Sequence, residues 1–204
     1  LVANEGSNVT VGGTVALGTN NLENAGDGDF SIGAVTATVE FGTDRTFLEN
    51  SGNGELDVAG DIVVTPGGTS NDNGDSDPIV ATIANGATGD LIIGGTISGN
   101  LATLSGAGAD EVLYIKLVAD GQSGGTVTIS SDNSIENLVN DGTITINGNL
   151  TLTGASDADH DNNSGTIDGS GTLIFADEGN NHTVAASGTL PDLQVDRQVT
   201  LNGT

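Results

Sequence analysis

Two aspartate-rich segments hold the side chains best suited to chemistry. The segment SDADHDNNSG (156–165) places carboxylates at alternate positions, and NDNGDSDP (71–78) offers a second group. Calcium takes about six to eight oxygen ligands, and carboxylates two residues apart on a turning loop can converge on one ion. We therefore predict structural Ca²⁺ at these two segments, with the ligands Asp157, Asp159, Asp161, Asp72, Asp75 and Asp77.

The competing interpretation is a pair of solvated acidic loops. Both segments lack the downstream glutamate of an EF-hand, and neither matches the glycine-rich nonapeptide calcium repeat. AGDGDF (25–30) is a third, weaker candidate.

The sequence offers little for catalysis. It has no cysteine, no Gly-x-Ser-x-Gly motif and only two histidines, His160 and His182. Three bases, Arg45, Lys116 and Arg197, are too few to neutralise an acidic glycan. Carboxylate pairs of the kind that glycosidases use abound, but nothing singles one out. We predict no catalytic or cofactor-binding residue and no enzyme activity, with a carbohydrate-active enzyme as the remote alternative.

The charge balance excludes two classes of partner. The 204 residues carry 28 acids against three bases, a formal net charge of −25. Such a chain would repel a nucleic-acid backbone and an anionic membrane surface. No apolar stretch is long enough for a transmembrane helix. We therefore expect no nucleic-acid partner and no membrane insertion.

The elements that must carry these residues are strands. The chain is rich in Gly, Thr and β-branched residues, and no long stretch has helical periodicity, which indicates an all-β protein. One template recurs: two short alternating strands joined at a central glycine, as in ITINGNLTL (144–152). Its copies start near residues 9, 56, 91, 144 and 199.

A bent strand of this kind cannot bury its apolar face alone, whereas stacked copies can. We therefore predict a single elongated repeat domain over residues 1–204, a parallel β-helix (β-solenoid) of about nine coils and roughly 40 Å in length. The alternative is an antiparallel β-sandwich or jelly roll, in which Asn147–Gly148 and the similar Asp-Gly pairs would be hairpin turns.

The segment GSGTLIFADEGNNHTVAASGTLPDLQVDRQVTLNG (169–203) resembles repeats of bacterial cell-surface β-helix proteins. These include filamentous-haemagglutinin-like adhesins and autotransporter passengers. The resemblance covers the second half of the chain best. It implies an exported protein with adhesive or structural work, and it carries no catalytic residue.

These observations predict an extracellular structural protein. Open strand edges favour head-to-tail pairing with other copies, as in a surface filament or surface layer. An adhesin stalk or glycan-binding module, with cell-surface glycans as partners, is the alternative. The chain starts at Leu1 without Met, which suggests processing or trimming. Candidate N-glycosylation sites are Asn8, Asn149, Asn162, Asn181 and Asn202.

Overall fold

The architecture was taken from a computed structural model of the chain. It describes residues 2–3, 6–40, 44–67, 79–86, 88–99, 113–119, 125–135, 137–140, 142–153, 162–163, 165–176, 182–186, 192–195 and 199–203. Within these ranges the chain forms strands and connecting turns and no helix. The predicted all-β class is confirmed.

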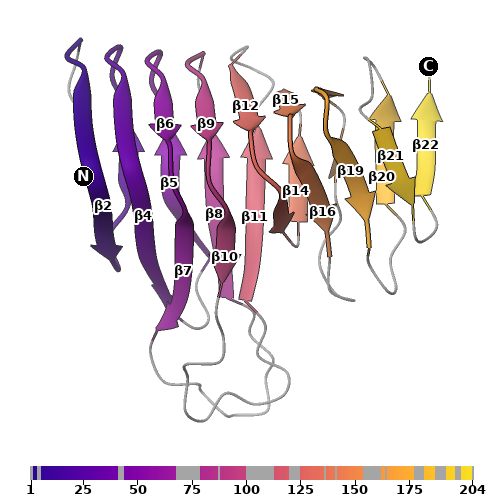
Figure 1. Cartoon of the computed structure of the whole chain (residues 1–204), viewed down its shortest axis with the longest axis horizontal. Coiled ribbons are helices and arrows are strands. Elements are labelled where there is room, and N and C mark those ends of the chain that lie inside the picture. Colours follow the sequence, from indigo (N-terminus) through magenta and orange to yellow (C-terminus); the bar gives the residue numbers. More distant parts are fainter. Residues whose placement is uncertain are drawn as a thin grey trace.

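Three sheets wrap around one core, and every strand pair described within them is parallel (Figure 1). Sheet A runs in the order β1 (Val2–Ala3), β3 (Leu22–Asn24), β5 (Asp44–Asn50), β8 (Ile79–Asn85), β11 (Leu113–Ala119), β14 (Asn137–Asn140), β17 (Asn162–Asn163), β20 (His182–Ala186) and β22 (Val199–Gly203). Sheet B runs in the order β10 (Ile97–Gly99), β7 (Ile62–Gly67), β4 (Phe30–Glu40), β6 (Leu56–Val58), β9 (Leu91–Ile93), β12 (Thr126–Ile129), β15 (Thr143–Ile146) and β18 (Thr166–Asp168), and β2 (Val9–Gly18) pairs with β4. Sheet C contains β13 (Asn133–Ile135), β16 (Asn149–Leu152), β19 (Thr172–Phe175) and β21 (Asp192–Val195).

The antiparallel alternative is wrong for the described strands. Asn147–Gly148 would be a hairpin turn in a sandwich, but here it separates β15 from β16, which belong to different sheets. Each of these strands pairs instead with strands from other passages of the chain, β15 with β12 and β18, and β16 with β13 and β19. The Asn-Gly pair therefore turns a corner between sheets.

The chain follows the same path around the core again and again. We call each passage, which ends on a strand of sheet A, a rung, and we count rungs from the one that contains β2 and β3. Equivalent positions in sheet B stack in register as Val9, Phe30, Leu56, Leu91, Val127, Ile144 and Ile167. Four of the five predicted repeat copies, those starting at 9, 56, 91 and 144, occupy this column. The fifth, at 199, lies in β22 of sheet A and pairs with β20. Rungs differ in length, from 17 residues between Val127 and Ile144 to 36 between Leu91 and Val127.

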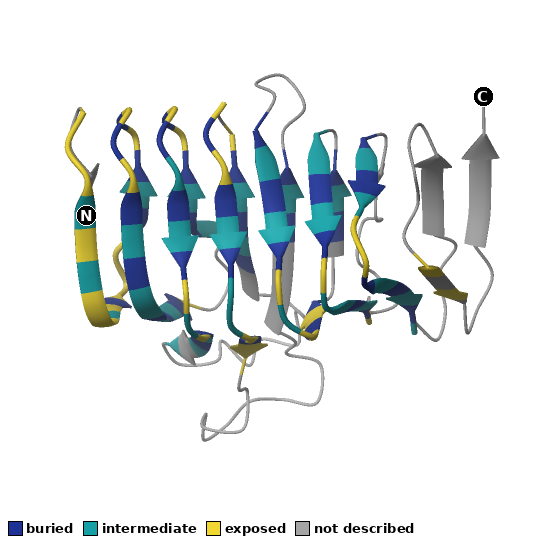
Figure 2. Ribbon diagram, turned by 45° about the horizontal axis from the view of Figure 1, so that its top comes forward, coloured by how far each residue is buried: buried dark blue, intermediate teal, exposed yellow. Residues whose placement is uncertain are grey.

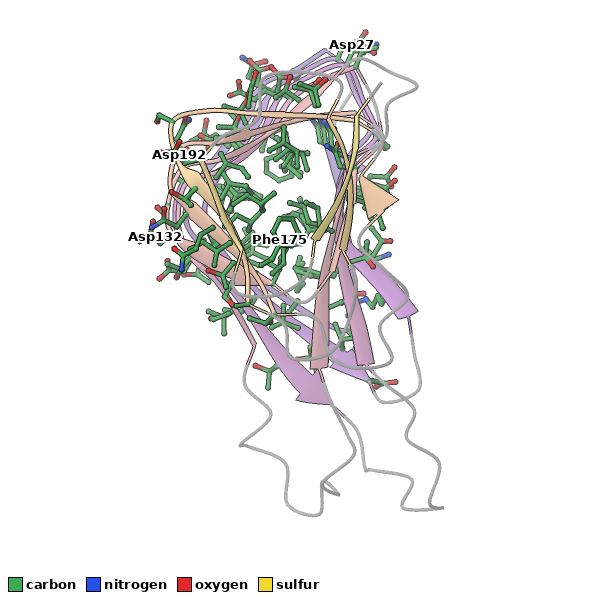
Figure 3. The ribbon with its side chains drawn as sticks, turned by 90° about the vertical axis from the view of Figure 1, so that its right-hand side faces the viewer. Asp27, Asp132, Phe175 and Asp192 are labelled. Atoms are coloured by element: carbon green, nitrogen blue, oxygen red, sulfur yellow. The ribbon has the colours of Figure 1, made fainter. Side chains whose placement is uncertain are left out.

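The core is a stack of small and branched side chains, one layer per rung. Inward residues alternate with outward ones, so buried and half-buried positions alternate along each strand (Figure 2). Val, Ile and Leu supply most of the buried side chains, and Phe30, Phe47 and Phe175 are the largest. Phe175 points into the interior of the ring of strands, whereas Asp27, Asp132 and Asp192 lie on its outer surface (Figure 3). Each fully buried aliphatic side chain contributes about 1.5–3 kcal/mol.

Glycine is needed at the corners because successive rungs touch there through their backbones. A Cβ added to Gly54, Gly60, Gly95 or Gly148 would lie closer than 3.0 Å to backbone atoms of the preceding rung. None of these four has the positive φ found at Gly6, Gly18 and Gly169. The predicted bends at glycine are therefore present, and glycine is required at these corners because the rungs stack closely there.

One interruption divides the stack. Strand β10 ends the sheet B ladder on one side, and β13 begins sheet C on the other. The two are near each other, but no ladder joins them. The face of the molecule therefore carries a step between the rung of β9–β10 and the rung of β12–β13.

Candidate functional site

The predicted calcium ligands, Asp72, Asp75, Asp77, Asp157, Asp159 and Asp161, all lie outside the described residues. The structure thus leaves that prediction untested. Among the residues that are described, no group of three His, Asp or Glu side chains is arranged to hold a metal ion. His160 is also outside the described residues, and His182 begins β20.

The described corner acids have a different role, because they tie one rung to the next. Asp29 accepts a hydrogen bond from the backbone N–H of Glu55 at 3.1 Å, and Asp90 accepts one from that of Thr126 at 2.8 Å. Asn8 replaces an acid in the first rung, where its Oδ1 accepts the Asp29 N–H at 3.1 Å. We call Asn8, Asp29, Glu55 and Asp90 the first corner row.

A second corner row alternates acids with neutral donors. Asp61 accepts both the backbone N–H and the hydroxyl of Thr96, each at 2.9 Å. Asp132 accepts the backbone N–H of Asn149 at 2.8 Å. The two bonds to Asp61 lower the pKa of its carboxyl. The carboxylate of Asp61 is therefore stabilised as an anion.

Two glutamates sit in less favourable surroundings. Burial raises the pKa of Glu55, and the neighbouring charges of Asp57, Asp29 and Asp90 raise it further. Burial likewise raises the pKa of Glu49, with a smaller contribution from Glu23 on the adjacent strand. Consecutive rungs thus carry like charges at the spacing of one strand, about 4.8 Å, and this repulsion opposes the stacking of the core.

An asparagine ladder, not anticipated from the sequence, lines the end of sheet A. Asn24, Asn50 and Asn85 are in register and buried, and Asn140 lies farther along the same column beyond Ala119. The Asn50 amide donates to the carbonyls of Gly54 at 3.1 Å and Asp90 at 3.2 Å, so it braces its own turn and the next rung. The signal was present in LENAGDGDF (22–30), LENSGNGEL (48–56) and IANGATGDL (83–91), which share Asn at the third position.

Arg45 is the basic side chain that the structure describes, and its hydrogen bonds are used within the fold. Its guanidinium donates to Asn21 Oδ1 at 2.8 Å, to the carbonyl of Thr38 at 2.5 Å and to that of Asn20. Burial lowers its pKa, and Glu40 opposes that shift. The hydrogen bonds of Arg45 therefore join the turn after β2 to the second rung.

The edge of β2 is the first candidate functional surface. Within the described residues β2 has one ladder neighbour, β4. Its Val9, Val11 and Val15 pack against the core but are only half-buried, and most of its other residues are exposed (Figure 2). Residues 6–21 contain no charged side chain, in a chain with 28 acids. This surface combines unpaired backbone, exposed apolar area and local neutrality.

The second candidate is a shallow groove at the step between β10 and β13. Its volume is about 410 Å³, and its lining residues are Ile97, Asp132, Asn133, Ser134, Asn149, Thr151 and Ile174. Asn133 occupies a position that is apolar in the adjoining rung, where Leu150 aligns with it. Its Oδ1 accepts the Ile97 N–H at 2.6 Å, and its amide donates to the carbonyls of Ser131 at 3.0 Å and Gly95 at 3.3 Å. One side chain thus bridges the missing ladder.

Comparison with known proteins adds no assignment. No protein-family model, curated protein or solved structure matches this chain. No helix capable of crossing a membrane occurs in the described part of the chain.

Proposed function

We propose that this chain is an extracellular structural protein that builds a surface filament or layer by stacking copies end to end. In this proposal the fold is a parallel β-helix, with the nine strands of sheet A marking about nine coils. The uncharged, exposed edge of β2 carries the proposal. Function would then be mechanical and interfacial, and no catalytic residue is assigned.

Edge pairing is supported by the direction of the strands. All described pairs are parallel, so the two edges of the stack differ. In this proposal the β2 edge of one copy pairs with the opposite edge of another copy. A contact of this kind is head-to-tail and does not close on itself, which generates filaments. Strand addition at an open edge satisfies the backbone groups and covers the half-buried valines.

Neutrality at this edge is the second support. The first corner row carries Asp29, Glu55 and Asp90 on successive rungs but Asn8 on the rung of β2. A docking copy would therefore approach a strand, β2, that carries no carboxylate. Strand β22, at the opposite end of sheet A, also contains no charged residue (VTLNG). Strands β2 and β22 thus carry none of the like charge that a net charge of −25 imposes elsewhere.

Proline at position 10 tests the edge directly. Val9 donates its N–H to Asp29 of the second rung at 2.8 Å. Because N–H groups alternate in direction along a strand, that of Thr10 points to the open edge. Thr10→Pro should abolish fibres or sheets in electron micrographs while the protein keeps its β-rich circular dichroism, because proline is tolerated on edge strands.

The matched control is Thr128→Val, on the outward face of β12 in the interior of the stack. It should assemble like the wild-type chain. Single short rods from the wild-type chain would contradict the proposal and favour the alternative, an adhesin stalk or glycan-binding module.

Calcium in segments 71–78 and 156–165 belongs to the same proposal. Its expected effect is loss of order in the fibres when chelator is added.

A further inference from the structure

We propose that the groove between β10 and β13 binds a neutral saccharide. This goes beyond end-to-end assembly, because the groove lies on the side of the stack and uses no residue of β2. Its position follows from the interrupted ladder, which leaves a hollow where other rungs continue a flat sheet.

The lining offers the polar groups that recognise sugar hydroxyls. Ser134 and Thr151 are aligned on adjacent strands of sheet C, whose backbones lie about 4.8 Å apart, so each contributes a hydroxyl to the same wall of the groove. Asp132 is held in place by the Asn149 N–H at 2.8 Å, so a carboxylate is oriented at the groove without the cost of ordering it on binding. Few, well-placed polar groups of this kind give a small-molecule site its specificity.

Apolar groups complete the site. Ile174 follows Thr151 in the same outward row and is half-buried, and Ile97 lies at the other wall. A pyranose ring has apolar C–H faces as well as hydroxyls, and branched aliphatic side chains can pack against them. The volume of about 410 Å³ is in the range of small-molecule pockets, about 300–1,000 Å³.

Charge selects the class of ligand. Among the described residues that line the groove there is one carboxylate and no base, on a chain of net charge −25, so acidic sugars and phosphates are disfavoured. A single carboxylate is too few for a calcium site, which needs about six to eight oxygen ligands. Neutral hydroxylated molecules remain. At the cell surface, where the proposed function places this chain, such molecules are chiefly polysaccharides.

Saturation-transfer NMR with the whole chain tests the site. The probes are neutral oligosaccharides of glucose, galactose, mannose and N-acetylglucosamine, with a uronic-acid oligosaccharide as the charged comparison. At least one neutral probe should bind, and Thr151→Val and Asp132→Asn should each weaken its binding about fivefold, the loss of one net hydrogen bond.

The matched controls are Thr128→Val, on the outward face of sheet B and outside the groove lining, and Asp61→Asn in the same corner row. Both should bind as the wild-type chain does, and thermal melts should show that all four variants fold. Binding should also persist in Thr10→Pro, which separates this inference from assembly. No binding by any neutral probe, stronger binding of the charged probe, or an equal loss in the controls would overturn the proposal.

Discussion

At the scale of the residue, the acidic side chains have two opposite effects on the stacking of rungs. Asp61 and Asp132 accept backbone N–H groups of the following rung, so they join rungs. Glu55 and Glu49 are anions beside other anions, so they push rungs apart. The sequence predicted metal ligation only for segments 71–78 and 156–165, whose predicted ligands lie outside the described residues, and it did not predict the roles of these corner acids. Composition alone cannot distinguish a carboxylate that accepts N–H groups from one that binds a cation.

Glu55→Gln should stabilise the protein near neutral pH. The folded state raises the pKa of Glu55, so its carboxylate destabilises the fold above the pKa, and the unfolding free energy rises as pH falls through that range. The variant removes the penalty, by a few tenths of a kcal/mol after solvent screening. Melts at neutral and mildly acidic pH should show a gain at neutral pH that vanishes on acidification. A loss of stability at neutral pH would contradict this.

Asp61→Ala should have the opposite sign. The folded state lowers the pKa of Asp61, so its contribution is present above the pKa of the unfolded chain and is lost as pH falls through the folded-state pKa. The variant should melt earlier than wild type at neutral pH, and the difference should shrink in acid. Chemical denaturation across this pH range measures it. A difference that stays constant with pH would show that the two bonds to Thr96 do not depend on the charge.

At the scale of the element, the repeating strand–corner–strand module was readable where it obeyed the template. In the copies at 56, 91 and 144 the equivalent inward positions are six residue numbers apart, with a glycine at the corner. Phe30 was missed because Phe30 and Val35 are five residue numbers apart, so its rung has one residue fewer at the corner. Val127 was missed because Ser131 replaces the corner glycine and Asn133 replaces an apolar residue.

The copy at 199 matched for a different reason. Alternation with a following glycine suits any exposed or half-buried strand, so VTLNG fits the template although it lies in sheet A. The pattern predicts which side chains point inward in a strand. It does not say to which sheet a strand belongs, because that depends on the lengths of the connections between rungs. The groove could not be predicted either, because it arises where no hydrogen-bonded ladder joins β10 to β13, and the side-chain pattern does not say which strands pair.

Gly54→Ala should destabilise the stack, whereas Gly12→Ala should not. The Cβ that the first substitution introduces would lie closer than 3.0 Å to backbone atoms of Gly28, and only a shift of one rung relative to the other could relieve that contact. A Cβ at Gly12 meets nothing within 4 Å. Thermal melts should show a fall of several degrees for the first variant, about 1–3 kcal/mol, and little change for the second. Equal melting temperatures would refute the close-stacking explanation of the corners.

At the scale of the whole molecule, stability is set by a core that stacks and a surface that repels. The continuous layers of Val, Ile and Leu favour the stack, while the net charge of −25 opposes it. The strands and the inward residues of the regular rungs were predictable because each follows from side-chain periodicity, whereas the parallel stacking was predicted from the recurrence of the module. The Asn ladder and the two corner rows required knowing which residues of distant segments become neighbours.

Salt should therefore raise the melting temperature. At about 0.1 M ionic strength the screening length is about 10 Å, roughly two rung spacings, so added salt reduces repulsion along the first corner row. Melts from low to moderate NaCl measure the effect. Glu55→Gln should reduce the salt dependence, and Thr128→Val should leave it unchanged. A melting temperature that is independent of salt would show that the carboxylate rows do not limit stability.

The unequal lengths of the rungs have a mechanical consequence. The two ends of the described chain lie at opposite ends of the stack, so a pull between them acts along the direction of the interstrand hydrogen bonds (Figure 1). Those bonds are loaded one rung after another, and the rungs should peel off successively. A 17-residue rung releases about 60 Å of chain and a 36-residue rung about 130 Å. In an optical trap the molecule should lengthen at modest force in unequal steps, each step corresponding to the unfolding of one rung.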